Sequence, residues 1–455
     1  MRTAALSSEV REQVQTGHAA SSREVTSMRA AVYSGNSRVG VESIPVPEIG
    51  PGEILIEVHA CGICHTDLKK IEYNLLPAPR VYGHETAGIV AAVGEGVDRF
   101  RTGDRVLVFH HIPCRKCFYC RKKLYAQCPV YKKVGVTAGF EPAGGGFSQY
   151  VRVMDWIVRD GVERIPDGVS FERASFVEPV NTCVKAVAQI DPQPDDVVCV
   201  LGQGPIGLIF TMLLNRIGSQ TLVTDTYASR RALALEFGAS ESFDPRSEGE
   251  AFERKVREAT DGRGADIVIL AASAPGIVEQ AVRCSRPGSK ILLFAQTSHK
   301  ERIEVSGADI CMGERLLCGA YSASVDLQHE SARLVFSGEL AVEKLISHRF
   351  SLEDIQAGIE LALHPDEQSL KIVVEPARRS IEAEPARRSI EAEPVRRSIE
   401  AEPAERSESF EPQRDSMGAP IAPRNLTEMD AHQDNLAANG VIRPHEGASH
   451  RGGHK

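Results

Sequence analysis

Residues 197–207 read VVCVLGQGPIG, and this stretch decides the fold of the central part of the chain. An apolar run typical of a buried strand leads directly into a G-x-G-x-x-G turn and an apolar helix. Gly202 permits the tight turn, Gly204 lets the backbone approach a pyrophosphate, and Gly207 lets helix and strand pack closely. The stretch therefore predicts a dinucleotide site.

The residues after the turn complete this prediction. Pro205 suits the first helical turn, where its missing N–H costs little. The free N–H groups around Ile206 and Gly207, at the positive end of the helix dipole, favour phosphate binding. The next strand ends in TLVTD, which places Asp225 where a carboxylate accepts hydrogen bonds from ribose hydroxyls and repels a 2′-phosphate. We therefore expect NAD rather than NADP, a preference that the nearby Arg230 would weaken.

The organisation of the chain follows from what lies on either side of this turn. Strands and helices alternate over 186–325, which predicts βαβ units and a parallel, doubly wound sheet. Over 28–185, short β-type runs alternate with Gly/Pro turns, which is typical of a barrel-like β domain. Residues 326–375 predict two helices and a closing strand. A chain of 455 residues exceeds one usual core, so we expect an α/β protein of two domains.

The two ends of the chain lack the pattern of a packed core. Residues 1–27 show no periodicity, and we expect a disordered leader. From Glu375 a nine-residue unit recurs as EPARRSIEA, with one large apolar residue and one proline per unit. Such a segment cannot bury enough surface to offset its ordering entropy, so 376–455 is predicted to be a disordered tail. A partner-binding tail is the alternative.

Composition excludes several classes of partner. The net charge is −9, which argues against a nucleic acid. No apolar run approaches the roughly 18 residues that a membrane helix needs, and the first residues contain no apolar signal region. We therefore expect a cytoplasmic protein whose partner is a small molecule, without a membrane.

Four of the 11 cysteines lie close together, with the spacing CxxCxxCx₇C. This clustering indicates a metal rather than disulfides. Four thiolates leave no open position on a tetrahedral ion, so the prediction is a structural zinc site. Basic neighbours favour the thiolate forms, and an iron–sulfur cluster fits this context less well. The predicted ligands are Cys114, Cys117, Cys120 and Cys128.

A catalytic zinc would instead need a position left open for water or substrate. Cys64 in A-C-G-I-C-H-T-D, His84 in Y-G-H-E and Glu178 in F-V-E-P-V are candidate ligands. Each alone is equally typical of a packed core side chain or a solvated turn. Their joint presence, in this order before a dinucleotide fold, favours a metal site.

Together these motifs resemble the zinc-containing medium-chain dehydrogenase/reductase superfamily, nearest its polyol and threonine dehydrogenase branch. The resemblance covers Met28 to about Glu375 and rests on G-I-C-H-T-D, G-H-E, the four cysteines, E-P and G-Q-G-P-I-G. It implies a GroES-like β-barrel catalytic domain, completed by 326–375, and a Rossmann domain. The active site would lie in the cleft between them.

The resemblance also implies how the catalytic metal is held. It places Cys64 and His84 on the zinc, with Asp67 hydrogen-bonded to the ligating histidine. The third protein position is Glu178, where simple alcohol dehydrogenases carry cysteine. Glu85 is an alternative ligand.

Further roles are implied for residues around the metal. Thr66 matches the hydroxyl that takes the alcohol proton, and Thr182 a residue that lines the nicotinamide pocket. Lys371 matches a basic residue near the pyrophosphate. His111 matches a histidine that approaches the substrate in threonine dehydrogenases, although a surface-loop role is equally consistent with its position. Lys69 stands where the family relay often has a histidine, so this exit for the proton is in doubt.

The function implied is oxidation of an alcohol to a carbonyl by hydride transfer, with NAD and two zinc ions per chain. Glu178 and His111 favour a secondary alcohol, such as a polyol or an amino-acid alcohol, over a simple primary alcohol. A zinc-free quinone or enone reductase and a non-enzymatic binding protein are the competing interpretations. The resemblance further implies a homodimer or homotetramer, commonly joined through the edge of the Rossmann sheet.

Overall fold

The computed structural model describes residues 26–131, 144–295 and 302–377 of the chain. The leader predicted for 1–27 and the tail predicted for 376–455 lie almost entirely outside the described residues.

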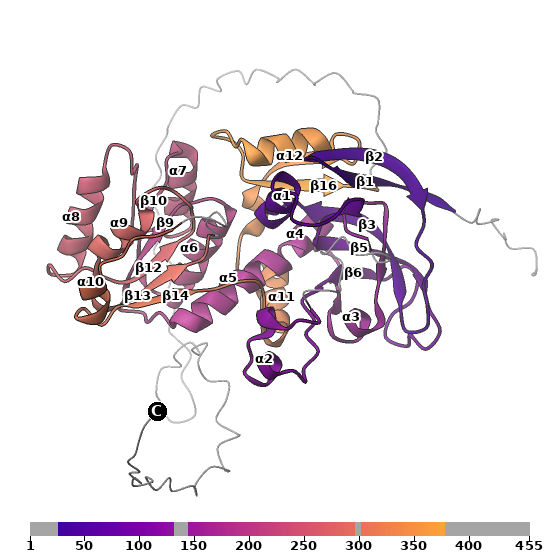
Figure 1. The fold of residues 1–455 in the computed structure, drawn as a ribbon, viewed down its shortest axis with the longest axis horizontal. Coiled ribbons are helices and arrows are strands. Elements are labelled where there is room, and N and C mark those ends of the chain that lie inside the picture. Colours follow the sequence, from indigo (N-terminus) through magenta and orange to yellow (C-terminus); the bar gives the residue numbers. More distant parts are fainter. Residues whose placement is uncertain (1–25, 132–143, 296–301, 378–455) are drawn as a thin grey trace, which may run out of the picture. The chain divides into compact units, whose positions relative to one another are not determined.

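A parallel sheet forms around the glycine turn, as the alternating pattern predicts (Figure 1). Its strand order in the described ranges is β11-β10-β9-β12-β13-β14, and every neighbouring pair is parallel. This is the order of a doubly wound nucleotide-binding sheet. Its strands are β9 (Val197–Leu201), β10 (Gln220–Thr224), β11 (Glu241–Phe243), β12 (Ala265–Leu270), β13 (Ser285–Leu293) and β14 (Leu316–Gly319). Its helices are α6 (Pro205–Ile217), α7 (Ala228–Glu236), α8 (Gly249–Ala259), α9 (Ile277–Cys284) and α10 (Gly307–Cys311).

The β-rich part is built on a mainly antiparallel sheet with the order β15-β16-β3-β5-β6-β8, on which β7 also pairs with β3. Its strands are β3 (Ile54–Gly62), β5 (Glu85–Val93), β6 (Arg105–Val108), β7 (Tyr150–Val153), β8 (Val162–Arg164), β15 (Ile346–Ser351) and β16 (Lys371–Glu375). A smaller sheet contains β1 (Ser27–Gly35), β2 (Arg38–Pro45) and β4 (Arg80–Val81). The antiparallel pairing of β16 with β3 joins the C-terminal strand to the N-terminal part of the chain.

Helices and 3₁₀ turns complete the β-rich part. They are α1 (His65–Glu72), α2 (Phe118–Arg121), α3 (Asp155–Asp160), α4 (Phe171–Ser175), α5 (Val177–Ile190), α11 (Gln328–Ser337), α12 (Ile355–Leu363), η2 (Tyr125–Gln127), η4 (Val325–Leu327) and η5 (Val342–Leu345). Among the helices of the described ranges, none has the length and apolar character needed to cross a membrane.

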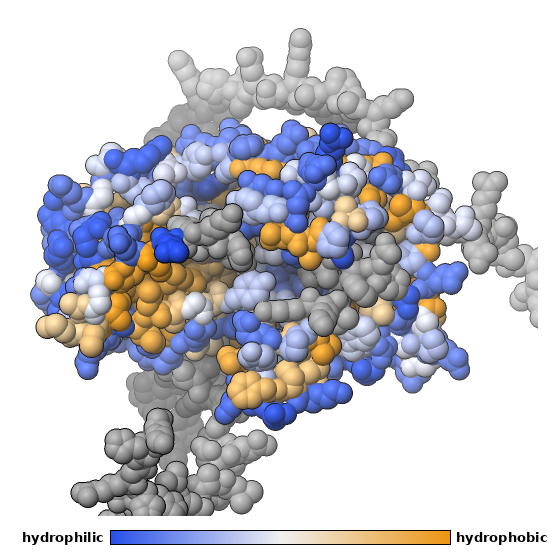
Figure 2. Space-filling model, viewed as in Figure 1, coloured by the Kyte–Doolittle hydropathy of each residue, from blue (hydrophilic) through white to orange (hydrophobic). Residues whose placement is uncertain are grey.

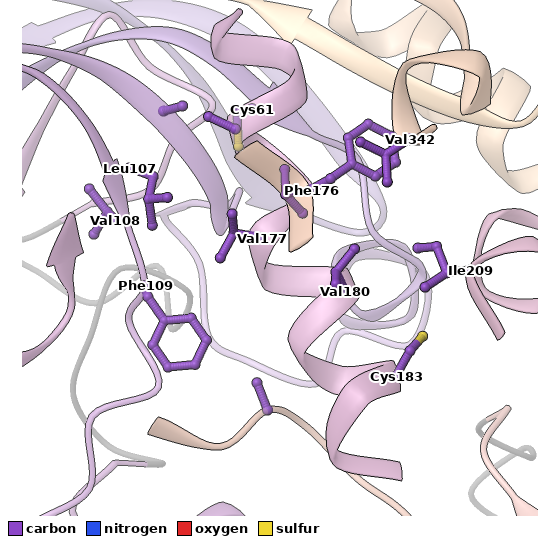
Figure 3. Packing of buried hydrophobic residues seen from close by; sticks show 14 of the residues in the cluster. Cys61, Leu107, Val108, Phe109, Phe176, Val177, Val180, Cys183, Ile209 and Val342 are labelled. Atoms are coloured by element: carbon purple, nitrogen blue, oxygen red, sulfur yellow. The ribbon is translucent and has the colours of Figure 1, made fainter. Parts of the chain in front are cut away.

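Helix α5 occupies the centre of the core and was not predicted from the sequence. Most of its residues are buried, so it lacks the polar face that reveals an amphipathic helix. Figure 3 shows Val177 directed toward Leu107 and Val108 of β6, whereas Ile209 of α6 lies on the other side of α5. One hydrophobic cluster therefore runs from the antiparallel sheet through α5 to the parallel sheet.

Candidate active site

A cavity of about 600 Å³ lies at the carboxyl ends of the parallel strands. Its lining combines residues that follow β9, β10 and β12 with residues of α1, β5 and α5. Open α/β sheets bind ligands at this edge. The cavity is lined by the predicted residues Cys64, Thr66, His84, Glu85, His111, Glu178, Thr182, Gly202, Gly204, Pro205, Ile206, Asp225, Arg230 and Lys371.

Three of these side chains form a metal-ligand cluster. The ligand atoms of Cys64, His84 and Glu85 all lie within 4.8 Å of one another. Cys64 is the N-cap of α1, so the free N–H of Thr66 points toward its sulfur at 3.4 Å. The Asp67 carboxylate lies 3.1 Å from Nδ1 of His84, as the resemblance implies. With Nδ1 held by this carboxylate, Nε2 of the imidazole is available to a metal.

The Glu85 carboxylate is anchored by a buried lysine. Nζ of Lys371 donates to Oε1 of Glu85 at 2.5 Å and to the Ile63 carbonyl at 3.2 Å. A Cβ at Gly62 would lie 1.9 Å from Oε2 of Glu85, so only glycine leaves room for the carboxylate here. The resemblance implied a place for Lys371 near the pyrophosphate. In the structure its ammonium lies on Glu85, within the same cavity.

Glu178, in the first turn of α5, lies outside this three-residue cluster. Its Oε1 accepts a hydrogen bond of 2.6 Å from Nε2 of His111. Burial opposes ionisation, but this hydrogen bond holds the pKa of the Glu178 carboxyl below its usual value. On the other side of the ring, Nδ1 of His111 lies 2.6 Å from the Tyr131 hydroxyl and 2.7 Å from that of Ser322. His111 is thus fixed in the cavity wall rather than in a solvated loop.

Tyr131, Ser322 and His110 were missed by sequence reasoning. Tyr131 and Ser322 are separated by 191 residues, yet their hydroxyls lie 2.8 Å apart. Ser322 also has a left-handed backbone (φ 62°), which non-glycine residues rarely adopt. No local motif marks the two hydroxyls, whereas the adjacent pair His110–His111 was a visible signal of which only the second member was used.

The two threonines occupy different positions along the cavity. Thr66 is half-buried in the first turn of α1, two residues from the Cys64 thiol. Thr182 is buried, and its hydroxyl donates to the Pro179 carbonyl at 2.8 Å within α5. Both therefore line the cavity, but the Thr182 hydroxyl is already engaged by its own helix.

The glycine turn has the geometry that its sequence predicts. Gly202 has φ 98°, a conformation that favours glycine. A Cβ at Gly207 would lie 1.9 Å from the Gly202 carbonyl oxygen, whereas a Cβ at Gly204 would meet nothing within 4 Å. Pro205 is the first residue of α6. Gly207 therefore serves the packing of helix on strand, and Gly204 leaves open space on the cavity side.

Asp225 follows β10 and faces the same turn. Its two carboxylate oxygens accept from the backbone N–H groups of Gln203 at 2.7 Å and Tyr227 at 2.8 Å. Arg230 stacks on the Tyr227 ring at 4.6 Å and donates to the Ser369 carbonyl at 2.6 Å. The carboxylate is thus fixed at the strand end, and the guanidinium is partly engaged elsewhere.

The four predicted structural ligands also converge. The sulfurs of Cys114, Cys117, Cys120 and Cys128 lie within 4.8 Å of one another. The backbone N–H of Lys116 points at Cys114 and lowers the pKa of its thiol to about 6. The lowered pKa of Cys114 is thus due mainly to a backbone N–H group and not to the basic side chains that the sequence suggested.

Both clusters suit zinc in their donor chemistry. A thiolate, an imidazole and a carboxylate suit a catalytic ion with an open position, and four thiolates suit a closed structural one. The carboxylate of Asp67 supports the first cluster, and backbone donors support the second.

Comparisons with known protein families agree with this geometry. Residues 50–164 match the alcohol dehydrogenase GroES-like domain, and residues 205–336 match the zinc-binding dehydrogenase domain. The chain is 31% identical to a sorbitol dehydrogenase of Bacillus subtilis (strain 168), over 77% of this chain and 98% of that one. It is 30% identical to an L-threonine 3-dehydrogenase of Pyrococcus abyssi, over 68% of this chain and 86% of that one.

A solved structure extends the likeness to three dimensions. A zinc-binding dehydrogenase of Sinorhizobium meliloti 1021, bound to NADP, superposes with a TM-score of 0.69 at 27% identity. The match covers 77% of this chain and 99% of the other. The two-domain α/β architecture and the resemblance to the polyol and threonine branch are thereby confirmed.

Proposed function

Because the chain belongs to the family of zinc-binding alcohol dehydrogenases, we propose that it oxidises a secondary, polyol-like alcohol with NAD as hydride acceptor. One observation carries this proposal. The cluster of Cys64, His84 and Glu85 shares a single cavity with Gly204 and Asp225 of the dinucleotide turn. A metal-bound hydroxyl and a nicotinamide can therefore meet there.

The roles of the residues follow from their positions. When bound, zinc would act as a Lewis acid toward the substrate hydroxyl, and NAD would accept the hydride. Cys64 and His84 would hold the metal with a carboxylate from Glu85 or Glu178. Thr66, beside the Cys64 thiol, would receive the substrate proton.

We infer two zinc ions per chain, one in each cluster, and a preference for NAD over NADP. Asp225 supports the second inference, because a fixed carboxylate at the strand end repels a 2′-phosphate. The similar dehydrogenase from Sinorhizobium meliloti was solved with NADP, so this preference depends on the residues of this chain.

We further propose the domain limits 28–185, 186–325 and 326–375, and a homodimer. Strand β14 is an edge of the parallel sheet, and Figure 2 shows hydrophobic side chains gathered over β13 and β14. Met312 and Leu316 are 84% and 54% exposed there. Exposed apolar residues on an open strand edge favour pairing with a second copy.

A single assay series tests the proposed function. The full chain is assayed with primary alcohols, secondary alcohols and polyols in the presence of NAD or NADP, following absorbance of the reduced cofactor. We expect the highest kcat/KM for a secondary alcohol or polyol with NAD, together with about two zinc ions by metal analysis. An active enone reductase without zinc would contradict the proposal.

A further inference from the structure

His110 is a buried polar side chain of the cavity that the mechanism above does not use. Only 2% of its surface is exposed, and it lines the same cavity as the metal cluster. Neither ring nitrogen has a hydrogen-bond partner among the described residues. Leaving both a donor and an acceptor buried and unpaired is costly, so such a group calls for an explanation.

The ring is held in place by its neighbours rather than by hydrogen bonds of its own. It packs on the His111 ring at 3.8 Å between centroids, and it meets the His84 ring edge-on at 5.6 Å. His111 is itself fixed by Glu178, Tyr131 and Ser322. His110 is therefore oriented beside His84 of the metal-ligand cluster, and by the geometry of the described residues neither of its nitrogens is engaged in a hydrogen bond.

The chemistry of this ring matches a hydroxyl group. A neutral imidazole offers one N–H donor and one acceptor nitrogen. A hydroxyl can pair with either nitrogen, as donor or as acceptor.

We propose that His110 is a specificity-determining residue that binds a second substrate hydroxyl, on the carbon next to the one that is oxidised. This proposal rests on the proposed function and deepens it. It makes the site selective for vicinal diols and polyols over alcohols with a single hydroxyl. A site built to hydrogen-bond a hydroxyl discriminates strongly against the analogue that lacks it, because its buried polar group is then left unpaired.

The test compares 2,3-butanediol with 2-butanol, which differ by one hydroxyl. The decisive quantity is the ratio of their kcat/KM values with NAD. We expect this ratio to be at least about tenfold in favour of the diol in the full-length wild-type enzyme. It should collapse toward one in His110→Phe and His110→Leu, two apolar variants of different size. His110→Gln, which keeps a donor and an acceptor, should retain part of the preference.

A matched control is His59→Phe. His59 packs on Phe171 and lies outside the cavity lining, so the ratio should not change there. Zinc content and NADH binding are measured on every variant. A structural role for His110 would lower both activities equally and leave the ratio unchanged, which would overturn the proposal.

Other outcomes distinguish a failure of the role proposed for His110 from a failure of the proposed dehydrogenase function. Equal wild-type kcat/KM for the two alcohols would overturn the role of His110 while leaving the dehydrogenase intact. A strong preference for L-threonine over the diol would also overturn it, because the second group recognised would then be charged. Failure of any alcohol to reduce NAD would refute both proposals together.

Discussion

Two carboxylates are candidates for the third ligand position beside Cys64 and His84, and each of them has its own hydrogen-bond partner. Glu85 pairs with Lys371, and Glu178 with His111. Burial raises the pKa of the Glu85 carboxyl against the opposing effect of Lys371, while the pKa of Glu178 is lowered. Among the carboxylates of the described residues, only that of Glu85 belongs to the cluster with Cys64, so we expect Glu85 rather than Glu178 to ligate zinc at rest.

Glu85→Gln is therefore expected to release the zinc bound at this cluster. Loss of a supporting residue typically costs about 10–100-fold in metal affinity, and loss of a ligand should cost more. Glu178→Gln should retain the zinc, and its activity should fall with the metal still bound. Zinc content after dialysis against a weak chelator distinguishes the two variants. Equal zinc loss from both would show that Glu178 also ligates at rest.

Asp225 offers a second test at the scale of one residue. Replacing it by Ser removes the charge that repels a 2′-phosphate and weakens contacts to the ribose. A hydrogen bond to a charged group contributes about 1.5–3 kcal/mol, so kcat/KM with NAD should fall roughly tenfold or more. With NADP it should rise. Asp261→Ser, in an exposed turn, is the control, and an unchanged NAD/NADP ratio in Asp225→Ser would contradict the assignment.

At the junction of β9 and α6, one glycine is needed for packing and another for cofactor binding, so substitutions can tell the two roles apart. In Gly207→Ala the new methyl would meet the Gly202 carbonyl at 1.9 Å, so the helix must shift. Overpacking of this kind costs about 1–3 kcal/mol, and both Tm and NADH affinity should fall. In Gly204→Ala the methyl has open space in the protein, so Tm should hold while NADH binding weakens. Thermal melts with and without NADH check both, and equal Tm losses would refute this division of roles.

The segment that carries the four cysteines can be tested by replacing one of them. Cys120→Ser should remove one zinc per chain, because a closed site needs all four thiolates. Metal binding contributes directly to folding of such sites, so Tm should fall by several degrees. Cys183 is a buried cysteine that belongs to neither cluster, so Cys183→Ser should keep both zinc ions. Loss of catalytic rather than structural zinc in Cys120→Ser would contradict the assignment.

The features that could be predicted from the sequence are those whose residues lie close together along the chain. The turn at Gly202, the carboxylate Asp225 at the next strand end and the four-cysteine lobe all lie within short stretches. Helix α5 could not be predicted from the hydrophobic pattern, because a helix that is buried on all sides has no polar face. The contact of Ser322 with Tyr131 could not be predicted either, because the two residues are far apart in the sequence and only tertiary packing brings them together.

In the molecule as a whole, one continuous hydrophobic core joins the two sheets and so fixes the walls of the cavity relative to each other. The cluster that contains Val58 of the antiparallel sheet also contains Val200 of the parallel sheet. Asn181 of α5 adds reciprocal hydrogen bonds with the backbone of Ser324, at 3.0 and 2.8 Å. The segment that follows β14 is thereby fixed to the helix that carries Glu178. Residues of the antiparallel sheet and residues that follow strands of the parallel sheet therefore line one cavity.

The open edge of the parallel sheet supplies the prediction for the assembled molecule. Among the described residues β14 is the last strand of its sheet, with Met312 and Leu316 exposed beside it, and a two-fold copy could pair with this edge and bury those side chains. Light scattering after size exclusion should give twice the 49.5 kDa of one chain. Met312→Lys combined with Leu316→Lys should yield monomers, because two buried cations per subunit would lack partners. Leu235→Lys, at a side chain that is 46% exposed on α7, should remain dimeric, and a dimer that survives the double substitution would place the interface elsewhere.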